Sequence, residues 1–378
     1  MKIAFLGNGN IGRPTFDIVY NKEGKFFLDN DIEVKYVLIK SMDEAPFEAP
    51  FFTTDFTKIE NDDEIELVFE VMGARVSYDF IKRCILKHKS IITANKAVIA
   101  DHFTELENLA KENGVKLFLE AAVGGGIPII TTLTYNRDVN NINRIEGILN
   151  GTTNYIITSM DKDNLTYEEA LKKAQKLGFA EADPSADVLG YDMVRKISIL
   201  SQIAYGVEVN YNDAYIFGIP NITKEFMNAG KKLNKTLKYI ASSEIKNNKV
   251  EVIVEPCLVD SSDIVASVNY EFNFVRYFGD HSQKQLAYGK GAGPATANAL
   301  VNDLKLYVEG YDPYVVPYRE MEVVGNKLSE GIYLIDYNGS FDMSLVDKEV
   351  DGFYLTKTID SKTFSNLLPN IKFYAKII

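Results

Sequence analysis

A group of acidic residues followed by a lysine stands out in GFAEADPSADVLGYDMVRK, residues 178–196. Pro184 and Gly190 break regular structure, so the acids are expected on an irregular loop ahead of a helix. Asp192 and Lys196, four residues apart, would share one face of that helix. A buried lysine beside carboxylates can transfer protons, but acidic residues also stabilise a helix N-terminus without any chemistry. The segment alone does not decide between a catalytic site and an ordinary helix start.

The elements ahead of this segment begin with a glycine motif. GNGNIG, residues 7–12, lies between a predicted strand (Lys2–Leu6) and a predicted helix (Pro14–Tyr20). In that context the first glycine permits a tight turn, the second lets the backbone approach a pyrophosphate, and the third lets helix and strand pack closely. The N–H groups that begin the helix would face the anion. The predicted cofactor-binding residues of this turn are Gly7, Gly9, Asn10, Ile11 and Gly12.

Strands and helices then alternate through the first third of the chain. The predicted strands are Ile32–Ile39, Glu66–Met72, Ser90–Ala94 and Val115–Glu120, and the predicted helices are Ser77–Lys87 and Phe103–Asn113. This alternation predicts an α/β fold with a doubly wound parallel sheet. Ligands bind at the carboxyl ends of such strands. Five candidate residues fall at these ends: Gly7, Lys40, Gly73, Lys96 and Glu120.

Two of these strand ends suggest particular ligands. Lys40 and Ser41 stand where an NAD-preferring fold carries an acid, and a cation with a hydroxyl suits a 2′-phosphate. This favours NADP(H) without excluding NAD(H), although a solvated lysine at a strand end is the simpler explanation. In EAAVGGGIPII, residues 120–130, three consecutive glycines imply a close approach of the backbone. Glu120 and free carbonyl groups suit a hard cation better than zinc, but the segment alone favours a hinge without an ion.

Composition limits the classes of function. The chain has 378 residues, of which 46% are hydrophobic and 25% charged, as expected for a globular protein of two or more domains. A net charge of −12 argues against nucleic acid or an anionic membrane as a partner. The two cysteines and three histidines have no metal-ligand or disulfide-framework spacing. The apolar run at the amino terminus is too short for a signal peptide, so we expect a cytoplasmic protein.

Several motifs in this order and spacing resemble the homoserine dehydrogenase family: GNGNIG, TANKAVIA, EAAVGGGIPII, GILNGTTNYI and GFAEADPSADVLGYDMVRK. The similarity extends over roughly residues 1–305 and includes DAYIFGIPNIT and GKGAGPATANALVNDL. The resemblance implies an NAD(P)-dependent oxidoreductase that interconverts L-homoserine and L-aspartate 4-semialdehyde in threonine and methionine biosynthesis. It also implies a homodimer or a dimer of dimers.

The resemblance assigns roles to individual residues. Lys196 matches the proton donor, and the other catalytic residues would be Lys96 and Asp192. The substrate would be bound by Glu181, through its ammonium group, and by Asp187, Thr152 and Tyr191. The cofactor site would include, besides the glycine turn, Lys40, Gly73, Thr93, Lys96 and Gly291. A monovalent cation, usually sodium, would be held by Glu120, Val123, Gly125 and Ile127, which reverses the hinge interpretation.

Two positions depart from the family pattern. Leu189 replaces a polar or acidic residue, and Ala74 replaces a glycine. Neither position carries an assigned chemical role, but both could weaken substrate or cofactor binding. The alternatives are therefore a related amino-acid semialdehyde oxidoreductase and a catalytically silent NADPH-binding regulator.

Three domains are expected. A Rossmann domain would cover residues 1–130, with residues 291–310 returning to it, and a mixed α+β substrate-binding and dimerisation domain would cover residues 131–290. The predicted elements that follow the first domain are strand Ile142–Leu149, a polar turn at residues 150–154, helix Thr166–Leu177, helix Lys224–Ile240, strands Lys249–Leu258 and Ile264–Phe274, a flexible turn Gly289–Gly293 and helix Ala295–Val308. Residues 314–378 would form a small α/β appendage, either a divergent ACT-like module or a plain dimerisation element.

Overall fold

The computed structural model describes residues 1–73, 75–313, 319–325 and 329–378. The chain forms two compact units, and each contains several separate segments. Unit 1 comprises Met1–Val139, Gln202–Glu208 and Gly289–Arg319, and unit 2 comprises Asn140–Ser201, Val209–Tyr288 and Glu320–Ile378. Ala74, one of the two departures noted above, and the first residues of the predicted appendage lie outside the described residues.

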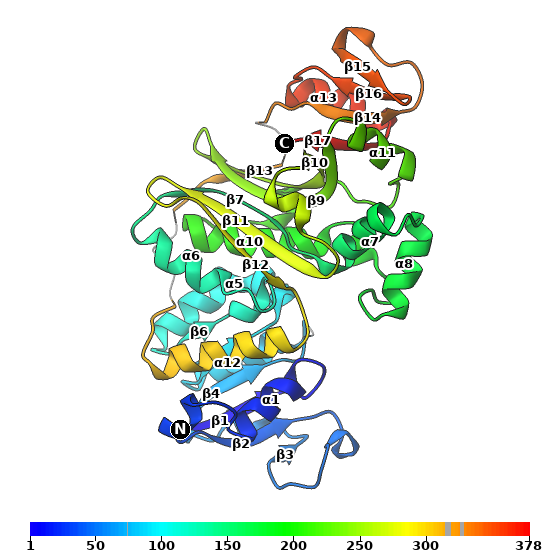
Figure 1. Ribbon diagram of the computed structural model, residues 1–378. Coiled ribbons are helices and arrows are strands. Elements are labelled where there is room, and N and C mark those ends of the chain that lie inside the picture. Colours follow the sequence, from blue (N-terminus) through cyan, green and yellow to red (C-terminus); the bar gives the residue numbers. More distant parts are fainter. Residues whose placement is uncertain (74, 314–318, 326–328) are drawn as a thin grey trace. The chain divides into compact units, whose positions relative to one another are not determined.

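Unit 1 contains a parallel sheet with the strand order β3-β2-β1-β4-β5-β6 (Figure 1). Its strands are β1 (Lys2–Leu6), β2 (Glu33–Leu38), β3 (Phe52–Thr53), β4 (Ile65–Glu70), β5 (Ser90–Thr93) and β6 (Leu117–Phe118). Because the order reverses next to β1, right-handed connections put the helices after β1 and after β4 on opposite faces. The predicted doubly wound sheet is thereby confirmed.

The helices of unit 1 are α1 (Gly12–Tyr20), α2 (Phe26–Asp29), α3 (Thr57–Glu60), α4 (Ser77–Leu86), α5 (Lys96–Glu112), α6 (Ile129–Arg137) and α12 (Pro294–Val308). Helix α12 packs against α1, and α4 packs against α5. Stacked rings of Phe5 and Phe69, with centroids 4.6 Å apart, lie in the core beneath α1 and α12. Helix α5 begins at Lys96, earlier than predicted, because a kink at His102 joins an additional turn to the expected helix.

Unit 2 contains a mixed sheet of eleven strands in the order β12-β11-β7-β9-β10-β17-β14-β16-β15, with β8 and β13 also paired to β10. These strands are β7 (Ile142–Ile148), β8 (Tyr215–Ile216), β9 (Lys235–Lys246), β10 (Lys249–Asp260), β11 (Phe272–Gly279), β12 (Gln283–Lys290), β13 (Glu322–Val324), β14 (Tyr333–Tyr337), β15 (Val346–Val350), β16 (Phe353–Thr356) and β17 (Ile371–Ile377). The accompanying helices are α7 (Gly151–Lys162), α8 (Tyr167–Lys176), α9 (Ser185–Val188), α10 (Tyr191–Tyr205), α11 (Lys224–Lys232) and α13 (Ser361–Leu367). The predicted mixed α+β architecture is confirmed, and α8 has the predicted capping box between Thr166 and Glu169.

Two predicted elements of unit 2 are wrong. The helix expected over Lys224–Ile240 ends at Lys232, because Asn234 adopts a left-handed conformation (φ 57°) and the next residues pair with β10 along the whole of β9. The strand expected over Ile264–Phe274 is a 3-10 helix at Ile264–Ser267, started by the side chain of Asp263, and the strand begins only at Phe272. The predicted turn at Gly289 belongs in part to strand β12.

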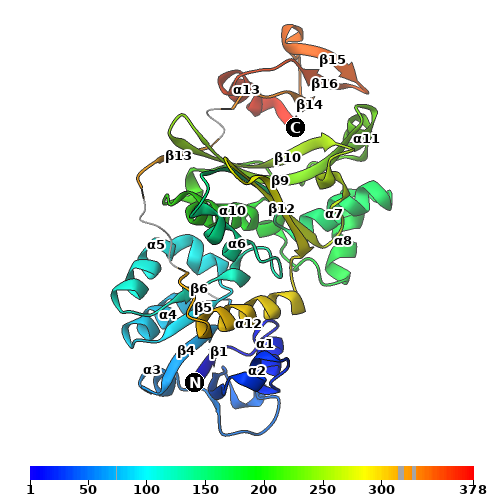
Figure 2. The ribbon, with the colours of Figure 1, turned by 60° about the vertical axis from the view of Figure 1, so that its left-hand side comes forward.

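The C-terminal strands continue the second sheet. Strand β17 runs parallel to β10, with Cys257 opposite Lys376 and Leu258 opposite Ile377. Figure 2 shows β14, β15, β16 and α13 beyond this pair. Stacked rings of Tyr333 and Phe364, 4.2 Å apart, form the centre of the tail's own core.

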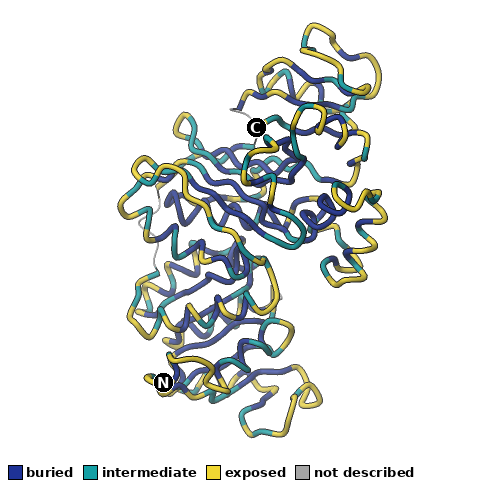
Figure 3. Tube along the Cα trace, in the orientation of Figure 1, coloured by how far each residue is buried: buried dark blue, intermediate teal, exposed yellow. Residues whose placement is uncertain are grey.

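Buried residues follow most strands of both sheets, whereas β12, β15 and the connecting loops are largely exposed (Figure 3). A membrane-crossing helix of sufficient length and hydrophobicity is absent from the described ranges.

Candidate active site

The glycine turn between β1 and α1 has the geometry expected of a nucleotide-binding loop. Gly7 has φ +104°, and a Cβ at residue 12 would lie 2.8 Å from the carbonyl oxygen of Gly7. Both positions therefore require glycine for close packing. At Gly9, by contrast, a Cβ would meet no atom within 4 Å, so the backbone borders open space. The loop leaves room where a pyrophosphate would approach the start of α1.

A buried polar network fixes the ends of β4 and β5. The Thr93 hydroxyl donates to Glu70 at 2.6 Å, and the backbone N–H of Asn95 donates to the same hydroxyl at 2.9 Å. Asn95 in turn caps α5 by accepting from Val98 N. Burial raises the pKa of Glu70, which the sequence did not mark as a site residue. This network holds the first turn of α5, where Lys96 lies half-buried.

Two of the three glycines after Glu120 pack against the segment that leads into α12. A Cβ at Gly125 would lie 2.4 Å from the backbone carbon of Gly291, and one at Gly126 would lie 2.5 Å from Cβ of Ala295. The predicted close approach of the backbone is confirmed, and its partner is Gly291–Ala295. Larger residues would separate these two parts of unit 1.

The carboxylate of Glu120 is fully occupied by hydrogen bonds. One oxygen accepts from Ile130 N and the other from Thr131 N, both at 2.8 Å, and the Thr131 hydroxyl also donates to Glu120. The side chain thus caps α6 from a distance in the sequence. The N–H of Glu120 donates to the carboxyl of Asp303 on α12 at 3.0 Å. Burial raises the pKa of both carboxyls, and the charge of Glu120 raises that of Asp303 further.

In unit 2, Asp192 and Lys196 form the predicted pair on α10. Nζ of Lys196 lies 2.8 Å from Asp192 Oδ2 and donates to the carbonyl oxygen of Leu149 at 2.7 Å. Lys196 is 9% exposed and Asp192 is 3% exposed. A close ion pair with so little solvent around it resembles a proton-transfer site more than a solvated helix start.

Asn150 joins this pair to Asp187 and was not among the predicted site residues. Its amide nitrogen donates to Asp187 Oδ1 at 2.7 Å and to Asp192 Oδ2 at 2.8 Å. The pKa of Asp187 is raised by burial and by the charge of Asp192. The available sequence signal was the polar turn that opens a helix, since Asn150 is the N-cap of α7.

The remaining predicted residues occupy less enclosed positions. The Thr152 hydroxyl donates to the carbonyl oxygen of Phe179, in the loop after α8. Glu181 and Tyr191 are exposed. Leu189 is also exposed, although its two neighbours in the sequence, Val188 and Gly190, are buried. Lys40 and Asn10 are exposed in unit 1, where Ile11 and Gly291 are half-buried. The predicted catalytic residues are therefore divided, with Lys96 in unit 1 and Asp192 and Lys196 in unit 2.

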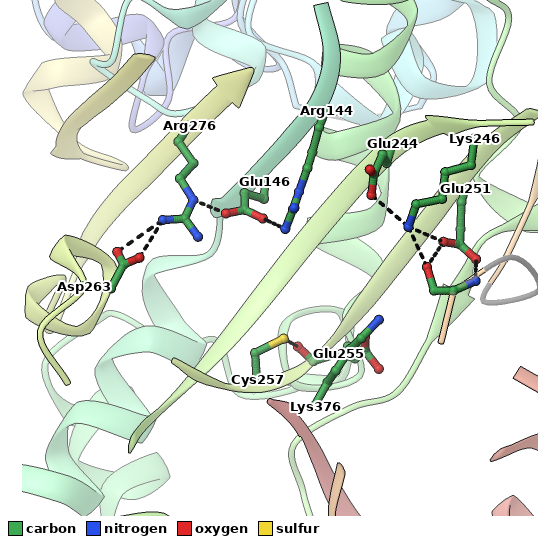
Figure 4. Close-up of polar contacts among 11 residues, drawn as sticks. Arg144, Glu146, Glu244, Lys246, Glu251, Glu255, Cys257, Asp263, Arg276 and Lys376 are labelled. Atoms are coloured by element: carbon green, nitrogen blue, oxygen red, sulfur yellow. Dashed lines mark hydrogen bonds and ion pairs between the residues drawn. The ribbon is translucent and has the colours of Figure 1, made fainter. Parts of the chain in front are cut away.

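A second polar cluster lies on one face of the unit 2 sheet and was not predicted (Figure 4). Arg276 pairs with both Glu146 and Asp263, and Arg144 pairs with Glu146 at 2.6 Å. Lys246 lies 2.9 Å from Glu244 on β9. All of these side chains except Asp263 border a hollow of about 450 Å³.

Comparisons with known proteins match a single family along most of the chain. Residues 7–120 match the family model "Homoserine dehydrogenase, NAD binding domain", and residues 128–304 match the model "Homoserine dehydrogenase". Residues 7–120 are therefore a nicotinamide-nucleotide-binding domain. Homoserine dehydrogenase from Bacillus subtilis is 35% identical over 311 residues, covering 80% of this chain and 72% of the relative. The Synechocystis enzyme of that name is 38% identical with the same coverage.

Solved structures extend the similarity to the tail. A homoserine dehydrogenase from Thiobacillus denitrificans has a TM-score of 0.91 at 26% identity, over 100% of this chain and 98% of that one. The Staphylococcus aureus enzyme at pH 7.5 has a TM-score of 0.80 at 30% identity, over 100% and 99% of the two chains. Together with the sequence relatives, these structures show that the chain belongs to the homoserine dehydrogenase family.

Proposed function

We propose that the protein catalyses the NAD(P)-dependent interconversion of L-homoserine and L-aspartate 4-semialdehyde, with Lys196 as the proton-transfer residue. The carrying observation is the buried Asp192–Lys196 pair on α10, within 2.8 Å, in a chain of this family. The reaction requires a proton to be moved at the substrate oxygen while hydride moves at the adjacent carbon.

The residues divide the chemistry as follows. When bound, the nicotinamide nucleotide supplies or accepts the hydride. In the reductive direction, Lys196 donates a proton to the aldehyde oxygen as it becomes a hydroxyl, and Asp192 stabilises the positive charge of Lys196 beforehand. The resemblance gives Lys96 the role of a second catalytic cation, which offsets negative charge. Glu181 binds the substrate ammonium, and the other polar contacts come from Asp187, Thr152 and Tyr191.

We propose that NADP(H) is the preferred cofactor and NAD(H) a weaker one. The support is Lys40 with Ser41 directly after β2, where both side chains are exposed and able to meet a 2′-phosphate. The glycine turn with Asn10 and Ile11 would hold the pyrophosphate, and Gly73, Thr93, Lys96 and Gly291 would border the nicotinamide half. A ratio of kcat/KM values for NADPH and NADH that favours NADH would contradict the preference.

We also propose a sodium site at Glu120, Val123, Gly125 and Ile127, formed by carbonyl oxygens. Since both carboxylate oxygens of Glu120 accept hydrogen bonds from α6, its side chain is a poor candidate ligand. Positive φ angles at Gly124 (77°) and Gly125 (62°) interrupt the extended backbone, in which successive carbonyl groups point to opposite sides, and so allow several carbonyl oxygens to face one cation. Activation by sodium or potassium over a large-cation salt such as tetramethylammonium chloride is expected.

We further propose that the protein forms a homodimer or a dimer of dimers. The face of the unit 2 sheet in Figure 4 carries cations and carboxylates side by side, and such a surface can complement a second copy of itself about a two-fold axis. Light scattering should give a mass of two or four chains of 42.5 kDa. A monomer at all concentrations would rule this arrangement out.

The central experiment is a steady-state assay of the purified protein with L-homoserine and each oxidised cofactor, with and without sodium, followed by the reverse reaction with the semialdehyde. We expect homoserine-dependent formation of NADPH. A panel of other hydroxy-amino acids and semialdehydes tests whether Leu189 changes the substrate. Tight binding of NADPH without turnover of any substrate would instead identify a silent regulator.

A further inference from the structure

One buried amide touches two of the acidic side chains of the candidate site. Asn150 is 4% exposed, and its Nδ2 donates to Asp187 Oδ1 and Asp192 Oδ2. The same oxygen of Asp192 lies 2.8 Å from Nζ of Lys196. The amide of Asn150 therefore lies between two carboxylates and connects Asp187, across the acidic loop, to the ion pair on α10.

The start of α7 fixes which way this amide faces. Oδ1 of Asn150 accepts from Thr153 N at 2.8 Å and from the Thr153 hydroxyl at 3.0 Å. Because the oxygen is committed to these donors as the N-cap, the two N–H bonds must face the carboxylates. The preceding residue contributes too, since the carbonyl oxygen of Leu149 accepts from Lys196. Residues 149 and 150 thus contact three ionisable groups from one helix start.

We propose that Asn150 is a positioning residue that holds Asp187 and Asp192 side by side and thereby fixes Nζ of Lys196 for proton transfer. The inference rests on the proposed function of Lys196 and adds the group that orients it. Two neighbouring carboxylates repel each other in a poorly solvated site. A neutral side chain with two donors, one for each carboxylate, offsets that repulsion without introducing a charge that would compete with Lys196.

The pKa of Asp187 provides a test of the proposal that is independent of protein stability. Burial and the neighbouring Asp192 raise the pKa of Asp187, whereas the hydrogen bond from Asn150 and the charge of Lys196 lower it. Loss of the Asn150 donor should therefore shift the protonation of Asp187 to higher pH. A side chain that served only as a helix cap would not produce this shift.

The test compares Asn150→Ser, which keeps a good N-cap oxygen and removes both bridging donors, with Asn150→Asp, which keeps the size and replaces the NH₂ group by a carboxylate oxygen. We expect kcat to fall by roughly 10- to 100-fold in both variants, as for displaced catalytic groups. The acidic limb of the kcat/KM profile should move to higher pH. Affinity for NADPH, measured by fluorescence, should stay at the wild-type value.

Thr166→Ala is the matched control, because it removes the N-cap of the next helix, α8, without contacting either acid. It should lower the unfolding temperature and leave kcat and the pH profile unchanged. Wild-type kcat and pH profile in Asn150→Ser would overturn the positioning role while leaving the proposed function intact. If the wild-type protein fails to turn over homoserine, the proposed function fails by itself. Titration of Asp187 by carbon-13 NMR then decides whether Asn150 is a positioning residue. Equal pKa values of Asp187 in wild type and Asn150→Ser would overturn the inference.

Discussion

At the scale of single residues, the environment of Lys196 separates two explanations that its sequence context left open. Nζ lies 2.8 Å from Asp192 Oδ2 and donates to the carbonyl oxygen of Leu149 at 2.7 Å. A lysine that only decorated a helix would extend into solvent, since its chain is long and its desolvation is costly. Burial with these two partners indicates that the position of the amine matters.

Replacement of Lys196 by methionine should therefore slow the chemical step strongly while keeping the fold. Methionine retains the unbranched apolar stem in the core but has no proton to donate. We expect kcat to fall by about 10²- to 10⁴-fold, the usual range for loss of a general acid, with unchanged affinity for NADPH. Stopped-flow measurement of hydride transfer checks the chemical step directly. Lys176→Met, at an exposed lysine of α8, is the control, and wild-type turnover in Lys196→Met would remove the assignment.

At the scale of elements, the sequence correctly predicts those segments that are stabilised by contacts with residues nearby in the chain. The alternating strands and helices of unit 1, the glycine turn and the capping box of α8 all follow local rules. Apart from the start of α5, their predicted ends lie within a few residues of the observed ones. The helix expected over Lys224–Ile240 is wrong because its second half is stabilised as β9 by pairing with β10 rather than by local propensity. Glu120 as a cap of α6 and Asn150 as a bridge depend on side-chain contacts that no periodicity encodes.

Gly190 controls the start of the helix that carries Lys196. It has φ +90°, and a Cβ there would lie 2.3 Å from the Tyr239 hydroxyl oxygen. Gly190→Ala should therefore cost about 1–3 kcal/mol through backbone strain alone, with a further loss from the overlap and a lower kcat. Tyr239→Phe removes the overlapping oxygen, which is buried and has no hydrogen-bond partner among the described residues. The double variant should recover part of both stability and kcat in urea unfolding and steady-state assays, and strictly additive losses would show that the two sites are independent.

The buried Lys238 on β9 is expected to make the free energy of unfolding increase with pH. Burial lowers the pKa of its ammonium to about 8, although Nζ donates to the carbonyl oxygen of Val268. Between pH 8 and the ordinary lysine pKa of 10.5, the unfolded chain holds the proton that the folded chain has released, so the stability contribution rises with pH. Relative to Lys238→Met, the wild type should gain up to about 3 kcal/mol of unfolding free energy from pH 7 to pH 10. Lys362→Met, at an exposed tail lysine, should show no such trend, and parallel curves for wild type and Lys238→Met would contradict the assignment.

At the scale of the whole molecule, neither unit is a continuous stretch of chain. The chain passes between the units after Val139, Ser201, Glu208, Tyr288 and Arg319, and helix α10 itself has its first residues in unit 2 and its last in unit 1. A unit that loses its structure therefore leaves the other with unconstrained connections at several points. The tail is joined to the rest of unit 2 by direct contacts. Strand β17 pairs with β10, and the Tyr374 hydroxyl donates to the buried Glu255 at 2.8 Å.

This interlaced chain path predicts a single cooperative thermal transition that includes the tail. The nicotinamide-nucleotide-binding domain lies in unit 1, yet NADPH at about 100 times its dissociation constant should stabilise the whole chain by about 2.7 kcal/mol. Tryptophan fluorescence cannot follow this, since the chain has no tryptophan, so calorimetry and far-ultraviolet circular dichroism are the appropriate probes. Lys196→Met should show the same shift with NADPH, because its cofactor residues are intact. Two resolved transitions, of which only one moves with NADPH, would mean that the units unfold independently despite the repeated crossings of the chain.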